Sequence, residues 1–178
     1  MSEVGCGVAL VDAGRYRRDM KLSEKGKFAL PPKLEPKHAQ ALSETLASWS
    51  GVHARTHWQL GDESVVDGAD FYVGDEELGH LHLDGDAHVA MGVALRNALV
   101  ERGLAHPFRW SREFVTWRVT SSASRGHAEW LFSLRLAALG GASLASLLLQ
   151  LPQRLTEASE SDGARGRSEA SRLVVVQE

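Results

Sequence analysis

The chain has 178 residues, of which 43% are hydrophobic and 24% are charged, and these proportions are those of an ordinary globular domain with enough residues to bury a core. Its net charge of −3 gives no overall basic surface, so we expect no nucleic-acid partner. No apolar run reaches the roughly 18 residues that a membrane span needs, so we expect no membrane partner either.

Residues 1–36 are predicted to be a flexible basic leader. Arginines and lysines gather between Arg15 and Lys27, and glycines and prolines interrupt any long element. Cys6 is the only cysteine, so no internal disulfide can form. A reducing, cytoplasmic location is expected.

One folded domain is predicted over residues 37–140. After Pro36, apolar residues at three- and four-residue spacing predict a helix that ends at Gly51. Period-two alternation predicts strands over residues 54–60, over residues 70–73 and around His80-x-His82, with an acidic turn region over residues 61–68. Trp58, Leu60, Phe71 and Val73 are expected to face the core, and Tyr72 is expected to face outward.

The second half of this domain is predicted to contain two helices and one strand. A helix over residues 93–102 ends at Gly103, a loop follows, and residues 114–119 alternate as a strand. A third helix is predicted over residues 127–139, with possible N-caps among residues 121–124. Residues 141–178 are predicted to be partly helical and then a disordered tail, since Ser, Glu, Gly and Arg dominate after residue 155.

This order predicts an α+β domain in two layers, with a mostly antiparallel sheet of about four strands and helices packed on one face. The strand parities then place polar side chains from several segments on the other face. These are Arg55, His57, Gln59, Tyr72, His80, His82, Thr116 and Arg118. We consider this face a candidate binding surface, with an ordinary solvated sheet face as the alternative.

His80 and His82 carry the chemical hypothesis. Residues two apart on a strand lie roughly 6.6 Å apart, so two imidazoles can meet at one divalent transition metal if further ligands come from elsewhere. As catalytic candidates, the two histidines serve as metal ligands or proton-transfer groups, and Arg118 holds an anionic group of a small-molecule ligand. His57, Tyr72 and Arg55 are candidate ligand-binding residues. Parity also groups His88 with these histidines, but Gly85 predicts a turn, beyond which parity is unreliable.

Two family resemblances arise from these motifs. Residues 71–88, then Leu95-Arg-x-x-Leu99-Val with Gly103, then Val115-Thr-Trp-Arg-Val119, resemble the "luciferase domain" family over about residues 39–139. The order Leu104-Ala-His106-Pro107 departs from the family pattern. This resemblance implies a fold and a shared His-x-His strand rather than an activity.

The second resemblance is to the cupins. Gly74, His80-x-His82 and an acid at Asp86 are similar to the first cupin metal motif, which implies Asp86 as a further metal ligand. A cupin carries Glu at the position of Asp86 and a later glycine-rich motif with a third histidine, which residues 103–114 do not supply.

The sequence leaves three classes of function open. They are an enzyme that uses the polar sheet face, including a cupin-like metal-dependent enzyme, a non-catalytic module that binds a ligand or a protein, and an interaction protein that acts through its tails. The sequence contains no serine nucleophile elbow, no glycine-rich phosphate loop and no CxxC pair. Common hydrolases, nucleotide-binding enzymes of the usual motifs and cysteine zinc ribbons are therefore not expected.

Overall fold

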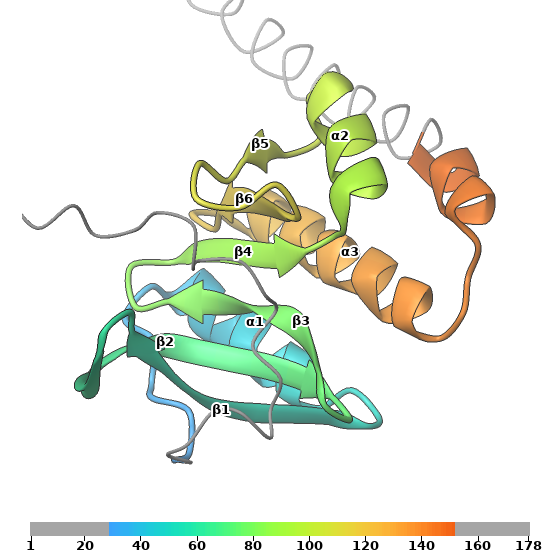
Figure 1. Ribbon diagram of the computed structural model, residues 1–178. Coiled ribbons are helices and arrows are strands. Elements are labelled where there is room, and N and C mark those ends of the chain that lie inside the picture. Colours follow the sequence, from blue (N-terminus) through green and yellow to red (C-terminus); the bar gives the residue numbers. More distant parts are fainter. Residues whose placement is uncertain (1–28, 152–178) are drawn as a thin grey trace, which may run out of the picture.

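The computed structural model of the chain describes residues 29–151. It has an α+β fold in which six strands form one antiparallel sheet, in the order β1-β2-β3-β4-β6-β5 (Figure 1). The strands are β1 (Val52–Gln59), β2 (Asp62–Val73), β3 (Glu76–His82), β4 (Asp86–Ala90), β5 (His106–Pro107) and β6 (Phe114–Arg118). The helices are α1 (Lys37–Ala47), α2 (Val93–Glu101) and α3 (Ser122–Leu139), and residues 144–151 are also helical.

The sheet has six strands rather than about four, because two short strands escape the sequence pattern. β4 follows the turn at Gly85, beyond which the alternation of β3 does not predict a strand. β5 has only two residues and lies in a region predicted as a loop. The predicted acidic turn region over residues 61–68 is wrong. β2 begins at Asp62, directly after Gly61, whose φ of +80° makes the tight turn out of β1.

All three predicted helices are present. α1 and α2 begin where expected, whereas α3 begins at Ser122, five positions before the predicted start at His127. The N-cap is Ser121, whose side chain accepts a hydrogen bond from the backbone N–H of Ser124 at 3.1 Å. The Ser124 side chain in turn accepts a hydrogen bond from the backbone N–H of Ser121, which completes a capping box. The serines therefore start the helix one turn earlier than its apolar stripe indicates.

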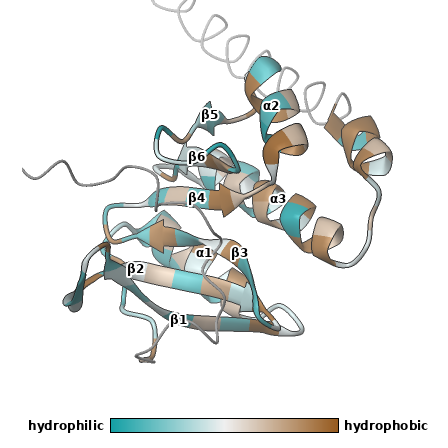
Figure 2. Cartoon of the chain, viewed as in Figure 1, coloured by the Kyte–Doolittle hydropathy of each residue, from teal (hydrophilic) through white to brown (hydrophobic). Residues whose placement is uncertain are grey.

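The core lies between the sheet and helices α1 and α3, which Figure 1 shows behind the strands. Hydrophilic and hydrophobic segments alternate along β2 (Figure 2), as a strand with two different faces requires. Phe71 of β2 meets Phe132 of α3 with ring centroids 5.9 Å apart in an edge-to-face contact, and both side chains are fully buried. Leu42 and Leu46 of α1 fill the space beside them.

One predicted orientation and one expected exposure differ from the structure. Leu60, expected inside, is 67% exposed, because the β1–β2 register shifts twice around Trp58 and carries the end of β1 away from the core. Tyr72, expected outward, is on the face opposite the core but is only 1% exposed. It pairs with His53 on one side and with Glu77 on the other. The second face of the sheet is therefore not simply solvated.

The chain before α1 is part of the packed structure from at least residue 29. The backbone N–H of Thr56 in β1 donates to the carbonyl of Ala29 at 3.1 Å, and its hydroxyl donates to the carbonyl of Leu30 at 2.6 Å. Leu34 is 1% exposed within the core. Most of the predicted leader and of the predicted tail lies outside the described residues.

Within residues 29–151, none of the helices has both the length and the apolar character that crossing a membrane requires.

Candidate metal site

Four histidines from three strands gather on the sheet face opposite the helices. In the register, His57 of β1 lies opposite Gly68 of β2, and Gly68 lies opposite His82 of β3. On the next strand, His80 of β3 pairs with His88 of β4. Directly opposed residues in an antiparallel sheet point to the same face, so the backbone alone brings these four side chains together.

Gly68 is what allows the histidines of β1 and β3 to meet across β2. A Cβ at this position would collide with the carbonyl of Leu81 and would lie 2.9 Å from the Cα of His82. The residue therefore lets β2 and β3 approach closely and leaves no side chain between His57 and His82. Their ring centroids are 5.2 Å apart.

The imidazole rings form one compact cluster. His57 stacks on His80 with centroids 4.1 Å apart, and His82 and His88 stand roughly at right angles to His80 at 5.1 and 4.9 Å. Nitrogen atoms of His57, His80 and His82 lie within 4.8 Å of one another. Nδ1 of His88 lies 3.0 Å from Nε2 of His80 and 3.2 Å from Nε2 of His82.

Each of the first three histidines is held by a carboxylate at its Nδ1 atom. His57 Nδ1 lies 2.6 Å from Asp70 Oδ1, His80 Nδ1 lies 2.9 Å from Glu77 Oε1, and His82 Nδ1 lies 3.0 Å from Asp67 Oδ2. An ionised carboxylate accepts, so it selects the tautomer with the proton on Nδ1. Carboxylates arranged in this way orient histidine ligands behind a metal ion.

In this tautomer, Nε2 of each of the three histidines carries a lone pair that can accept a hydrogen bond or bind a metal ion. For His80 and His82, that lone pair faces Nδ1 of His88. His88 has at most one proton on that nitrogen, so it can donate to only one of the two. Lone pairs that converge in this way repel one another unless a cation lies among them. The nitrogens of His80, His82 and His88 are close enough together for three neutral imidazoles that share one metal ion.

A β-bulge brings Glu77 to this face. The β2–β3 register shifts between Phe71 and Tyr72, so that Phe71 pairs with Gly79 while Tyr72 pairs with Glu77. The extra residue, Leu78, keeps its side chain in the core, and Glu77 turns toward His80. Simple alternation assigns Glu77 to the opposite face, which is why the sequence pattern alone misses it.

The deepest part of the cluster excludes water. Asp70, Glu77, His80 and His88 are 1%, 6%, 8% and 9% exposed. Burial, together with the neighbouring His82, lowers the pKa of His88 to about 4, although Asp86 and Asp84 oppose this shift. His88 is therefore neutral near pH 7, which is the form that binds metals. Phe108 packs on its ring with centroids 4.2 Å apart.

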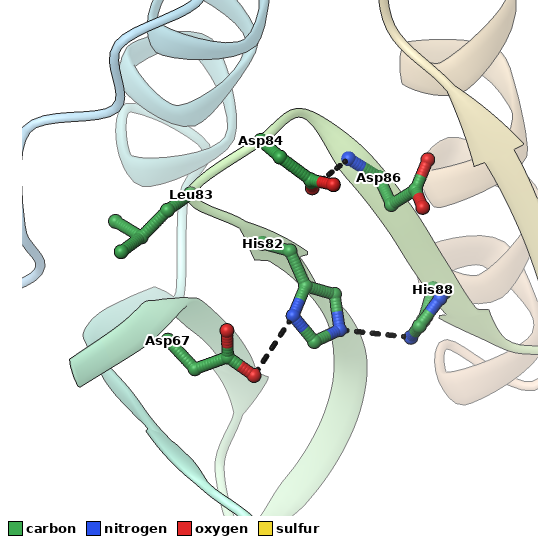
Figure 3. A pocket seen from close by; sticks show the side chains of 6 residues that line it. All are labelled: Asp67, His82, Leu83, Asp84, Asp86 and His88. Carbon is green, nitrogen blue, oxygen red and sulfur yellow. Dashed lines mark hydrogen bonds and ion pairs between the residues drawn. The ribbon is translucent and has the colours of Figure 1, made fainter. Parts of the chain in front are cut away.

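The cluster borders an open depression of about 410 Å³ (Figure 3). Its lining residues are Asp67, His82, Leu83, Asp84, Asp86 and His88. Arg118 of β6 lies at its rim, with Nη1 2.7 Å from Asp84 Oδ2 and 2.9 Å from Asp86 Oδ1. Partial burial raises the pKa of Asp84, but the hydrogen bonds from Arg118 and from the Asp86 backbone outweigh it, so this pKa lies below its usual value.

The sequence-predicted residues divide into two groups here. His57, His80 and His82 lie together in the cluster, and Arg55 lies opposite Asp70 in the β1–β2 register. Asp86 and Arg118 pair with each other at the rim. Among the described residues, neither group of side chains with metal-binding geometry includes Asp86 or His88. Besides His57, His80 and His82, these two groups contain Asp70 and Glu77.

Sequence reasoning did not select His88, Asp67, Asp70 or Glu77. The alternation of residues in the sequence could have indicated two of them, Asp70 and His88. Asp70 has the same parity as Tyr72 in its predicted strand, and Ala87 and Val89 alternate with His88 as in a strand.

Comparison with known families gives one match. Residues 75–137 match the model of the family described as "Luciferase domain", which confirms the resemblance inferred from the motifs. The matched segment begins later than the expected limit near residue 39. In chain order it covers β3, β4, α2, β5, β6 and most of α3. No curated protein and no solved structure matches the chain.

The cupin resemblance does not extend to the fold. The six-stranded sheet is open, with β1 and β5 at its two edges, whereas a cupin closes its strands into a barrel-like jelly roll.

Proposed function

We propose that this luciferase-domain-like protein binds a divalent transition metal through His57, His80 and His82 and presents that ion to a small molecule in the adjoining depression. The single observation that carries the proposal is the carboxylate behind each histidine, at 2.6, 2.9 and 3.0 Å. Three separate Nδ1 contacts of this kind fix the tautomers of three histidines whose nitrogens lie within 4.8 Å of one another, which an ordinary solvated face does not require.

The donor set determines which metals fit. Imidazole nitrogens suit zinc, copper, iron, nickel and cobalt better than magnesium or calcium, which prefer oxygen ligands. A bound ion of this class supplies Lewis acidity to a ligand or lowers the pKa of a bound water. Of the chain's own residues, Asp70 and Glu77 hold the ligands in place, and Arg118 at the rim is suited to an anionic group of the small molecule once it leaves Asp84 and Asp86.

The same geometry fits either an enzyme or a non-catalytic metal-dependent binding module. His82 lines the depression and its side chain is 22% exposed, which favours a site that a ligand can reach over a wholly buried structural one. A protein that acts only through its tails is the least compatible alternative, because it assigns no role to the buried carboxylate–histidine pairs.

The test is the metal content of the purified full chain, beside His80→Ala/His82→Ala and a matched control, His53→Ala/His106→Ala. The control removes two exposed histidines outside the cluster. We expect near-stoichiometric transition metal in the wild type and in the control, and none in the cluster variant. If the wild type takes up no metal even after incubation with zinc, iron(II), cobalt, nickel or copper(II), the proposal is wrong.

A further inference from the structure

We propose that His88 is a fourth nitrogen ligand of this metal, and that the four imidazoles hold the ion from one side, leaving exchangeable positions toward the depression for a small anionic or neutral donor ligand. The inference rests on the proposed metal site and goes further, because it assigns the coordination number of the ion and the chemical class of what binds to it.

Nδ1 of His88 lies 3.0 Å from Nε2 of His80 and 3.2 Å from Nε2 of His82. Two nitrogens bound to one ion at roughly 2.0–2.1 Å lie about 2.9 Å apart at a right angle and about 3.4 Å apart at the tetrahedral angle. Both distances fall in this range. An ion bound to His80 and His82 therefore also lies within bonding reach of His88.

The ring of His88 is also fixed in this orientation. His88 is paired with His80 across the β3–β4 ladder and is 9% exposed. Phe108 packs against one side of its ring, and His80 and His82 lie edge-on to it at 4.9 and 4.6 Å. A ligand that is already oriented loses little conformational entropy when the metal binds.

All four donors come from one face of one sheet, as the registers His57–Gly68–His82 and His80–His88 require. His57 joins the other three once its ring turns out of the nearly parallel stack on His80. A closed tetrahedral site surrounds its ion with ligands on all sides. Four nitrogens on one side instead favour a five- or six-coordinate ion, which suits copper(II), nickel, cobalt and iron(II) better than structural zinc.

The remaining positions of the ion open toward the depression, because His82 and His88 both line it. Its volume of about 410 Å³ lies in the range of small-molecule pockets. A ligand there binds directly to the metal through one donor atom, such as a carboxylate, phenolate or hydroxyl oxygen. Azide is a suitable probe, because it binds to open metal positions and gives a characteristic absorption band.

The experiment uses the full chain loaded with copper(II). Electron paramagnetic resonance, with pulsed detection of coupled nitrogens, counts the imidazole ligands, and an azide titration reports the exchangeable position. We expect four imidazoles and a saturable azide band in the wild type. His88→Gln, which keeps a similar side-chain volume, should show three imidazoles and at least about tenfold weaker copper binding, a factor like that for altered metal-site partners. His106→Ala should match the wild type.

The outcomes separate the two proposals. Absence of copper binding in the wild type overturns the metal site itself. Copper bound by three imidazoles in the wild type overturns only the role of His88, and this measurement does not depend on the folding of any variant. Four imidazoles with no azide binding overturn the open position, since the ion is then closed to exogenous ligands.

Discussion

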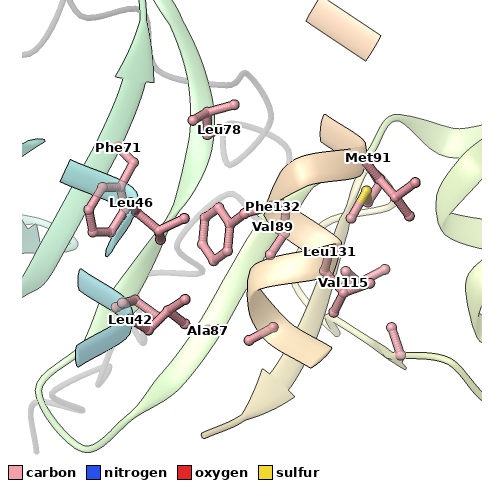
Figure 4. Packing of buried hydrophobic residues seen from close by; sticks show 14 of the residues in the cluster. Leu42, Leu46, Phe71, Leu78, Ala87, Val89, Met91, Val115, Leu131 and Phe132 are labelled. Carbon is pink, nitrogen blue, oxygen red and sulfur yellow. The ribbon is translucent and has the colours of Figure 1, made fainter. Parts of the chain in front are cut away.

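The two faces of the same sheet both contain buried side chains but are built from opposite chemistry. On the helix side, consecutive strands contribute alternating apolar residues such as Phe71, Ala87, Val89 and Val115, packed on α1 and α3 (Figure 4). On the other side, the intervening positions are carboxylates and histidines, several of which are less than 10% exposed. This difference supports the proposed site, because apolar residues fill a core at lower cost than buried ionisable groups do.

The difference between the faces predicts separable effects of mutation. Substitutions on the helix side should lower the free energy of unfolding without a specific effect on metal binding. Substitutions on the histidine side should change metal affinity more than stability. The glycine between His57 and His82 affects both faces, because it sets the spacing of β2 and β3.

The largest effect is expected for Phe132→Ala on the helix side. Phe132 is fully buried and packs edge-to-face on Phe71. Loss of a buried phenylalanine costs about 3–5 kcal/mol of unfolding free energy. Urea unfolding followed by circular dichroism measures it, with Leu149→Ala, a 75% exposed leucine, as the control expected to change little. Equal effects of the two substitutions would contradict the assignment of the core.

Gly68→Ala is expected to have the next largest effect. The added methyl meets the backbone of Leu81 and His82, so β2 and β3 must separate, at a cost of about 1–3 kcal/mol. Metal binding should weaken as well, since His57 moves away from His82. Gly74→Ala is the matched control, because a Cβ there meets no atom within 4 Å and only the φ of +58° is strained.

The comparison of Gly68→Ala and Gly74→Ala uses both unfolding and metal titration. Gly74→Ala should lower stability by about 1 kcal/mol and leave metal affinity unchanged. If Gly74→Ala weakens metal binding as much as Gly68→Ala, the effect comes from general loosening of the hairpin rather than from the spacing of the histidines.

A smaller effect is expected for the carboxylates behind the ligands. Asp70→Asn and Glu77→Gln keep the side-chain shape but weaken the hold on His57 and His80, and each should lower metal affinity by about 10- to 100-fold. Competition with a chelator of known affinity measures this change. Asp84→Asn alters a 60% exposed carboxylate at the rim and should leave the affinity unchanged. Equal loss in all three variants would indicate a nonspecific effect of charge.

The smallest effect is expected for Arg118→Ala. Its ion pairs with Asp84 and Asp86 are short but roughly half exposed, so their loss should change the unfolding free energy by less than about 1 kcal/mol. Metal content should stay unchanged, because Arg118 does not contact the histidines. Weaker binding of a carboxylate ligand to the metal-loaded variant would support a role in holding anions, and an unchanged affinity would remove Arg118 from the site.

Periodicity predicted the fold class and the polar face because both follow from local patterns. The alternation around His80 and His82 and the apolar stripes of α1 and α2 correspond to regular elements. The features that it missed depend on backbone irregularity or on pairing between strands. A bulge moves Glu77 to the other face, and the turn at Gly85 separates His88 from the pattern of β3.

The candidate metal-site residues could not all be predicted from the sequence for the same reason. The cupin-like motif indicated Asp86 after the His-x-His pair, whereas the register places His88 opposite His80 and places Asp86 opposite Arg118. A motif specifies spacing along the chain, but the neighbours of a strand residue are set by the strand beside it.

The contact of Ala29 and Leu30 with Thr56 bears on where the chain can be shortened. β1 is an outer strand of the sheet. On its outer side, the carbonyls of Ala29 and Leu30 accept hydrogen bonds from the backbone N–H and the hydroxyl of Thr56. A version trimmed to start at Lys37, the sequence-predicted domain limit, loses these carbonyls and the buried Leu34. Its bare strand edge then offers hydrogen-bonding groups to other molecules, which is how sheet proteins begin to aggregate. Shortened versions intended for crystallisation or spectroscopy should therefore keep the residues from 29 onward.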